Sequence, residues 1–180
     1  MRVIATVVRA AVLSVVLTPS ASAQGPAIDP VALAKLQAYR SAFVSGDDEA
    51  VFAAVPPSLL EGILSDPEES PEMLRSAMRE AMRAIMASVE LMSMSYTFED
   101  ATQGSTGAGR TYVVVPATIL TASSDDQGTA AFRVAMLAVV EDGAWYVYPV
   151  ADDVTVALLH EAYPDMAGVS FPYGPGAVLP

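Results

Sequence analysis

The chain contains no cysteine among its 180 residues. This absence excludes disulfides, thiolate zinc sites, iron–sulfur ligation and thiol nucleophiles. It also excludes the lipid anchor of a lipoprotein, because that anchor is attached to a cysteine after the cleavage site. A core of packed apolar side chains therefore has to stabilise the fold alone.

Basic residues are scarce, since 9 Lys and Arg stand against 21 Asp and Glu, which gives a formal charge of −12. Nucleic acids and anionic lipid surfaces attract basic patches, so this balance argues against both kinds of partner. A solvated acidic surface without a specific partner is the simplest interpretation, and it favours solubility.

Long apolar runs are also missing, because a membrane-spanning helix needs roughly 20 apolar residues and no run reaches that length. The longest run, residues 3–17, is interrupted by Arg9. Arg2 precedes it and the small residues 21–23 follow it, which is the order of a secretory signal peptide. We expect residues 1–23 to be cleaved and the protein to be periplasmic or secreted; an uncleaved membrane anchor is the alternative.

Cleavage would remove two arginines and change the formal charge from −12 to −14. The remaining length suits one domain. We divide the chain into a signal peptide (1–23), a tether (24–28), a single α+β domain (29–166) and a tail rich in proline and glycine (167–180). The tail is either disordered or an extended strap, and its aromatic residues Phe171 and Tyr173 favour a strap packed on the domain.

Capping residues and a period near 3.6 predict helices in the first half of the chain. Asp29 and Pro30 open the first helix as N-cap and first helical residue, and Gly46 ends it. Ser70 and Pro71 open the longest helix in the same way. The predicted helices cover residues 30–45, 48–55, 58–64, 71–90 and 153–162.

After Glu90 the apolar period changes to 2, which is typical of half-buried strands. The Asp142-Gly143 pair predicts a hairpin turn. The predicted strands cover residues 92–98, 110–122, 129–140 and 144–150, and a glycine-rich loop covers 103–109. The second strand has β-branched residues on both faces, so we expect it to lie centrally.

Helices followed by hairpin-linked strands indicate an α+β domain whose helices gather on one face of an antiparallel sheet. A strongly twisted meander would curl around the longest helix, residues 71–90.

Three local patterns resemble the cystatin-like group, most nearly the NTF2-like superfamily. Residues 45–51 resemble its GD-x-x-x-V turn between helices, four antiparallel strands follow a long helix, and residues 141–147 resemble its final hairpin, with Trp145 opening the closing strand. The resemblance spans residues 29–150. It implies N-terminal helices packed on a curled four-stranded antiparallel sheet, with a conical pocket between them.

The resemblance implies no single activity, because this fold hosts isomerases, dehydratases, binding domains and dimerisation modules. The chain also departs from the pattern. Residues 56–70 are predicted to be helix and turn where such domains usually have a strand or hairpin, and the last helix and the tail are additional.

An isomerase of this kind needs a carboxylate base in an apolar pocket and a hydroxyl that stabilises the enolate. Three strand tyrosines offer hydroxyls: Tyr96, Tyr112 and Tyr148. The acidic residues near the strands all lie beside turns: Glu99, Asp100 and Glu141. None has an apolar sequence environment, so we predict no catalytic residue. The only histidine, His160, is on the last helix, where we expect it to be solvated or to cap the helix.

Six of the nine methionines lie between Met73 and Met94. Thioethers are soft ligands that suit Cu(I), which an exported protein would meet. Methionine also fills irregular cores, and Met92 and Met94 alternate onto one strand face with Tyr96. We adopt core packing and predict neither a metal nor another cofactor.

These observations favour an exported domain that binds a small apolar ligand or a protein partner over an enzyme. We predict that four aromatic residues on strands line the pocket: Tyr96, Phe98, Phe132 and Trp145. Ordinary core packing is the alternative for each of them. The alternative functions are an enzyme of the isomerase, dehydratase or hydrolase type and an envelope-associated interaction module.

Overall fold

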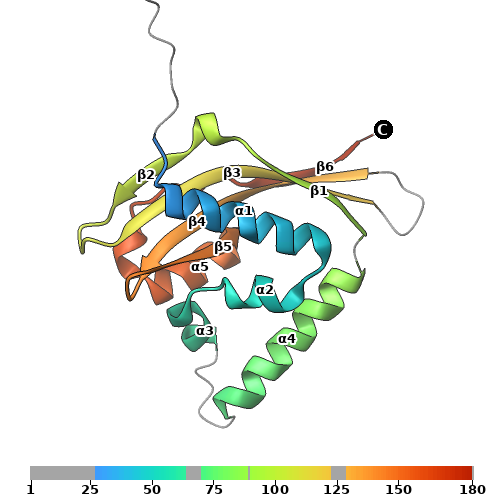
Figure 1. Ribbon diagram of the computed structural model, residues 1–180, viewed down its shortest axis with the longest axis horizontal. Helices are drawn as coiled ribbons and strands as arrows, with labels where there is room; N and C mark the ends of the chain where they lie inside the picture. The colour runs from blue at the N-terminus through green and yellow to red at the C-terminus, as the bar shows by residue number, and fades with distance from the viewer. Residues whose placement is uncertain (1–26, 64–69, 89, 123–128, 180) are drawn as a thin grey trace, which may run out of the picture.

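The computed structural model describes residues 27–63, 70–88, 90–122 and 129–179, so the predicted signal peptide lies outside the described residues. Within these ranges the fold is α+β, as predicted (Figure 1). The helices are α1 (Pro30–Ser45), α2 (Asp48–Ala53), α3 (Pro57–Ile63), α4 (Pro71–Ser88) and α5 (Asp153–Ala162), with the 3-10 turns η1 (Phe98–Asp100) and η2 (Pro164–Met166). The strands are β1 (Glu90–Tyr96), β2 (Thr102–Ser105), β3 (Thr111–Ala122), β4 (Thr129–Glu141), β5 (Ala144–Val150) and β6 (Gly174–Leu179).

The capping residues set the helix ends as the sequence predicts. The Asp29 carboxylate accepts a hydrogen bond from the Val31 amide at 2.8 Å, and Gly46 ends α1 with a φ of 74°, which favours glycine. At α5, Asp152 and Thr155 form a reciprocal capping box.

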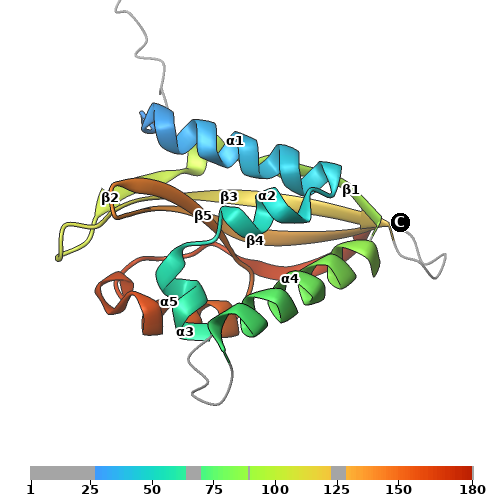
Figure 2. The same cartoon turned by 60° about the horizontal axis from the view of Figure 1, so that its bottom comes forward.

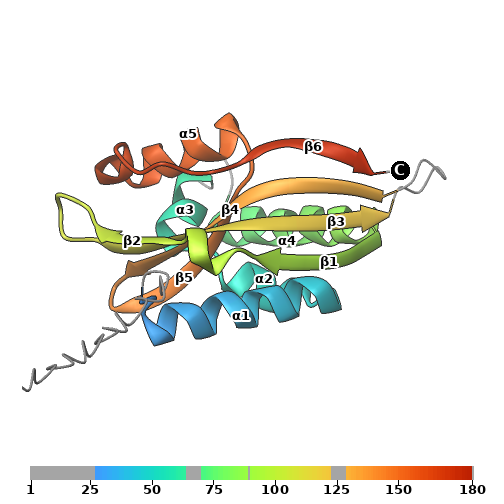
Figure 3. The same ribbon diagram turned by 90° about the horizontal axis from the view of Figure 1, so that it is seen from above.

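The sheet is antiparallel and has six strands in the described chain, two more than predicted. The path β1-β3-β4-β5 contains the four predicted strands, with β3 inside it as expected. The additional strands β2 and β6 pair with β3 and β4, and Figure 3 shows β6 alongside β4. Both are short and carry Gly or Pro instead of an alternating pattern, so their pairing depends on the long strands beside them.

Apolar cores cover both faces of the sheet, so the expectation that the helices gather on one face was wrong. Figure 2 shows α1 on one side of the strands and α3 and α5 on the other. The physical reason is visible in β4, where every residue from Val134 to Val139 is buried. Because alternate residues point to opposite faces, such a strand needs cover on both.

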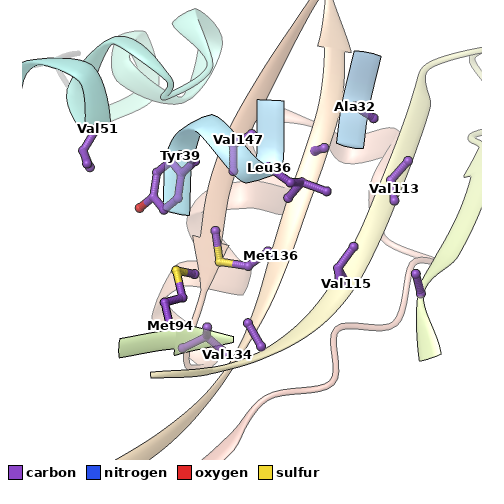
Figure 4. Packing of buried hydrophobic residues seen from close by; sticks show 13 residues of the cluster. Ala32, Leu36, Tyr39, Val51, Met94, Val113, Val115, Val134, Met136 and Val147 are labelled. Carbon is purple, nitrogen blue, oxygen red and sulfur yellow. The ribbon is translucent and has the colours of Figure 1, made fainter. Parts of the chain in front are cut away.

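We call the buried apolar residues on the α1 side of the sheet the first core cluster. There α1 lies against the sheet, with Leu36 and Tyr39 facing the strands (Figure 4). The opposite side is the second core cluster. The first consists of Ala32, Leu36, Tyr39, Val51, Met94, Ala101, Val113, Val115, Ala117, Val134, Met136, Ala138 and Val147. The second consists of Val55, Leu59, Val114, Ala135, Leu137, Val139, Val150, Leu159, Tyr163 and Met166.

The longest helix, α4, lies beside α2 (Figures 1 and 2). Arg83 forms an ion pair with Asp48 at 2.9 Å, and the Arg79 guanidinium lies 5.0 Å from the centroid of the Phe52 ring. The apolar residues that recur at helical spacing along α4 are Leu74, Met78, Met82 and Ile85, and their side chains lie outside the described part of the structure. Among the described side chains, those of α1 pack on one face of the sheet and those of α5 on the other.

The methionines of β1 differ from the prediction. Met94 is buried in the first core cluster, but Met92 is 53% exposed. The pairing of β1 with β3 shifts register between Leu91 and Ser93, and this bulge interrupts the expected alternation.

None of the helices in the described ranges has the length and apolar character that crossing a membrane requires.

Candidate functional site: a groove beside strand β3

A groove of about 730 Å³ lies on the face of β3 that is opposite α1. Its floor is formed by alternate residues of β3, because side chains two positions apart share one face of a strand. These floor residues are Tyr112, Val114, Pro116 and Thr118. Ala117 and Arg133 also line the groove, and Arg133 is the register partner of Thr118 on β4.

The first wall of the groove forms where the chain leaves the sheet between β1 and β2. The wall residues are Thr97, Asp100 and Thr102. The Thr97 amide donates to the Pro116 carbonyl at 2.9 Å, so the polar groups of residue 116 face this wall. Proline has no amide hydrogen, but β3 needs none at residue 116. The pairing of β3 with β1 ends at Ala117 and its pairing with β2 begins at Val114, so Pro116 lies in the gap between these two partner strands.

The second wall is the segment between η2 and β6, which we call the strap (residues 168–173). Every strap residue except Phe171 lines the groove. The Phe171 side chain instead packs against the second core cluster, and the Val169 amide donates to the Met166 carbonyl at 2.9 Å. The predicted tail is thus an extended segment held against the domain.

Tyr173 fastens the far end of the strap. Its hydroxyl donates a hydrogen bond to Oδ1 of Asp153, the first residue of α5. This hydrogen bond to a carboxylate raises the pKa of Tyr173, so the hydroxyl is protonated and donates at neutral pH. The same side chain lines the groove.

The lining is mixed in character. Eight of its fourteen residues carry a hydroxyl or a charge. Six of these are hydroxyls from Thr, Ser and Tyr, and the remaining two are the charged groups of Arg133 and Asp100. A groove of this composition offers hydrogen bonds and one positive charge beside an apolar floor.

Two of the predicted ligand-binding residues lie together, but they pack against the first core cluster. The rings of Tyr96 and Phe98 meet edge to face at 5.3 Å between centroids. The Tyr96 hydroxyl donates to the Leu36 carbonyl at 2.7 Å. Burial raises the pKa of Tyr96, which keeps this hydroxyl protonated.

The other two predicted residues lie apart from that pair. Phe132 is 43% exposed on β4. Trp145 lines a smaller hollow of about 320 Å³ between α1, α2 and β5, together with Lys35 and several alanines. None of the four predicted residues lines the groove beside β3.

The groove residues that sequence reasoning missed come from three separate elements. Tyr112 was considered as a hydroxyl donor, and the tail aromatic Tyr173 indicated a packed strap. No sequence pattern marked Arg133 as a groove residue. The strap that lines the groove with it is more than thirty residues away along the chain and reaches it only because β6 pairs with β4.

A polar network stands at the end of the sheet near the β4–β5 hairpin. Glu141 Oε1 accepts hydrogen bonds from the Ser58 amide at 3.0 Å and the Ser58 hydroxyl at 2.8 Å. Its Oε2 accepts one from the hydroxyl of the buried Tyr163. Burial raises the pKa of Tyr163 and the bond to Glu141 raises it further, so this hydroxyl remains a donor.

Arg110 extends the network to η2. Its guanidinium lies 4.3 Å from the centroid of the Tyr163 ring and pairs with Asp165 at 3.4 Å. Thr106 also donates to Asp165, at 2.5 Å. Burial opposes ionisation of Asp165, but the Thr106 hydrogen bond and the Arg110 charge outweigh it and hold the pKa of Asp165 below its ordinary value. The network joins the β2–β3 hairpin, η2 and α3 to the sheet.

His160 differs from the expectation of a solvated or capping residue. It is partly buried in the last turn of α5, and its Nε2 is enclosed without a hydrogen-bond partner among the described residues. It lines neither the groove nor the hollow. No group of His, Asp and Glu suited to a metal ion occurs in the part of the chain that the structure describes.

No protein-family model matches this chain, and no curated protein matches it either.

Proposed function

We propose that this domain binds a small ligand in the groove between β3 and the strap. The observation that carries the proposal is the groove itself, whose volume of about 730 Å³ falls within the range of small-molecule sites. Its walls come from two segments on either side of β3, so a ligand would be held between them and not only on a flat surface. The mixed lining suits a ligand with an apolar body and a polar end.

The fold supports an NTF2-like assignment as part of this proposal. The supporting features are the α1–α2 turn at Gly46-Asp47, the antiparallel meander and the β4–β5 hairpin with Trp145 at the start of β5. Apolar side chains of α1 pack against the sheet on the α1 side, and the hollow beside them is less than half the volume of the groove, which favours a binding site on the opposite face. The signal-peptide pattern predicted for residues 1–23 is the basis for proposing export to the periplasm or beyond the cell.

An enzyme is the second candidate, because Asp100 and Tyr112 line the same groove. A carboxylate base for proton abstraction works in a desolvated site, whereas Asp100 is exposed. The other carboxylate–tyrosine pair, Glu141 and Tyr163, has both carboxylate oxygens engaged and lies outside the groove lining. Ligand binding without catalysis is therefore the better-supported function.

The test is to fill the groove and follow the ligand. Wild-type protein, purified from the exporting cells, is analysed by native mass spectrometry, as are Thr118→Trp and Gln37→Trp. Thr118 lies on the groove floor, whereas Gln37 is exposed on α1 and supplies a control that introduces the same indole side chain outside the groove. We expect a small molecule on the wild type and on Gln37→Trp, and none on Thr118→Trp.

Retention of the ligand by a folded Thr118→Trp protein would refute the groove as the site. A wild type that carries no small molecule, and that shows no rise in melting temperature across a metabolite library, would refute the binding function. Circular dichroism establishes that both variants are folded.

A further inference from the structure

The groove contains one cation that has no partner. Arg133 lines the groove, and within the described ranges its side chain forms no ion pair, hydrogen bond or ring contact. The arginines that do have partners are Arg40 and Arg79 over aromatic rings, Arg83 with Asp48, and Arg110 with Asp165. Arg75, the remaining described arginine, is exposed on α4.

The Arg133 side chain contacts the start of β6, next to the strap. Arg133 pairs in register with Gly174 of β6, next to a shift in the β4–β6 register. A Cβ atom at residue 174 would lie 3.9 Å from the Arg133 Cδ atom, so the stem of Arg133 runs against the backbone there. Arg133 is the register partner of Thr118 on the groove floor, and its side chain is exposed to solvent.

The charge balance of the site restricts what this arginine would bind. The groove offers one cation and one carboxylate, in a chain whose formal charge is −12. A surrounding field of this sign disfavours ligands with several negative charges. A guanidinium matches a single carboxylate well, because its planar fork donates two parallel hydrogen bonds.

We propose that the groove binds a small carboxylic acid in its ionised form, with Arg133 holding the carboxylate. This inference rests on the proposed binding function and names its ligand class. The apolar body of the ligand lies along Pro116 on the floor and Val169 on the strap. The hydroxyls of the walls are available to any further oxygen atoms of the ligand.

The experiment uses octanoate as the probe, 1-octanol as its neutral counterpart and octyl phosphate as a more highly charged anion. Isothermal titration at neutral pH compares the wild type with Arg133→Gln and Arg133→Lys. Arg75→Gln is the matched control, because it removes an equal charge from an exposed arginine outside the groove. We expect octanoate to bind the wild type at least tenfold more tightly than either other probe.

Arg133→Gln should weaken octanoate binding by about tenfold or more and leave 1-octanol binding unchanged. Arg133→Lys should retain part of the affinity, because an ammonium keeps the charge but not the fork. Arg75→Gln should bind octanoate as the wild type does.

Equal affinity for octanoate and 1-octanol, or unchanged octanoate binding by Arg133→Gln, would overturn carboxylate recognition while the binding function stands. Tighter binding of octyl phosphate would replace the proposed ligand class with phosphate esters. If the wild type binds none of the three probes, carboxylate recognition is wrong, and the mass-spectrometry experiment alone decides the binding function.

Discussion

The two faces of this sheet use the same strands for different purposes. On the α1 face, Val113 and Val115 of β3 are fully buried with Leu36 of α1. On the opposite face, Val114 is also buried, as part of the second core cluster. The next β3 residues on that face, Pro116 and Thr118, instead form the floor of the groove. A change of side-chain chemistry along one face of β3 thus converts a packed core into an open groove.

The means of closure differ as well. The α1 face is closed by apolar packing, and the hydroxyl of Tyr96, which packs against that core, donates to a helix carbonyl. The opposite face is fastened by carboxylates: Glu141 binds Tyr163, Asp165 binds Arg110, and Asp153 binds Tyr173. We expect the first face to carry most of the stability and the second to respond to pH and ligand.

The largest expected effect comes from opening the packed face. Leu36 is 0% exposed in the first core cluster, so Leu36→Ala leaves a cavity between α1 and the sheet. We expect the free energy of unfolding to fall by about 2–5 kcal/mol, measured by urea denaturation. Val31→Ala, at an exposed position of the same helix, should change it by less than about 0.5 kcal/mol. Similar losses for the two variants would mean that α1 does not close this face.

An intermediate effect is expected at Asp165 on the other face. Because the pKa of Asp165 is lowered below its ordinary value of 3.8, its ionised form stabilises the fold above that pH. Asp165→Asn should cost about 1 kcal/mol at pH 7, and the difference from the wild type should vanish as the pH falls through the lowered pKa. Denaturation curves between pH 7 and pH 2 measure this.

Glu99→Gln provides the control for that series, since Glu99 is exposed and forms no ion pair among the described residues. An Asp165→Asn deficit that stays constant down to pH 2 would show that the lost stability does not come from the ionised carboxylate.

The smallest effect on stability is expected at the strap. Tyr173→Phe removes the hydrogen bond to Asp153 and keeps the ring in the groove wall. We expect the free energy of unfolding to change by less than about 1 kcal/mol, and octanoate to dissociate roughly twofold to fivefold faster. Stopped-flow displacement measures the rate. Dissociation at the wild-type rate would show that the hydrogen bond between Tyr173 and Asp153 does not hold the strap against the ligand.

Much of the fold follows from local signals in the sequence. Asp29 and Gly46 mark the ends of α1, and the Asp142-Gly143 turn marks the β4–β5 hairpin with positive φ at both residues. The apolar run in β4 also contained the evidence for two covered faces, although the helices were expected on one face only.

The groove could not be predicted from such signals, because its parts meet only in the folded chain. Arg133 and Tyr173 come together through the pairing of β6 with β4, which short Gly- and Pro-containing sequences do not indicate. The aromatic residues that were predicted to line a ligand pocket, such as Tyr96, lie at alternating positions that point to one face of a strand. That pattern is the same for a core position and for a pocket position, and in Tyr96 it marked the core.

The most direct test of the account is to locate the bound ligand. Octanoate is titrated into the ¹⁵N-labelled protein while amide chemical shifts are recorded. Binding in the groove predicts saturable shifts at residues 97–102, along β3 from Tyr112 to Thr118, and through the strap. Shifts confined to the hollow around Trp145, or no saturable shifts at all, would contradict it.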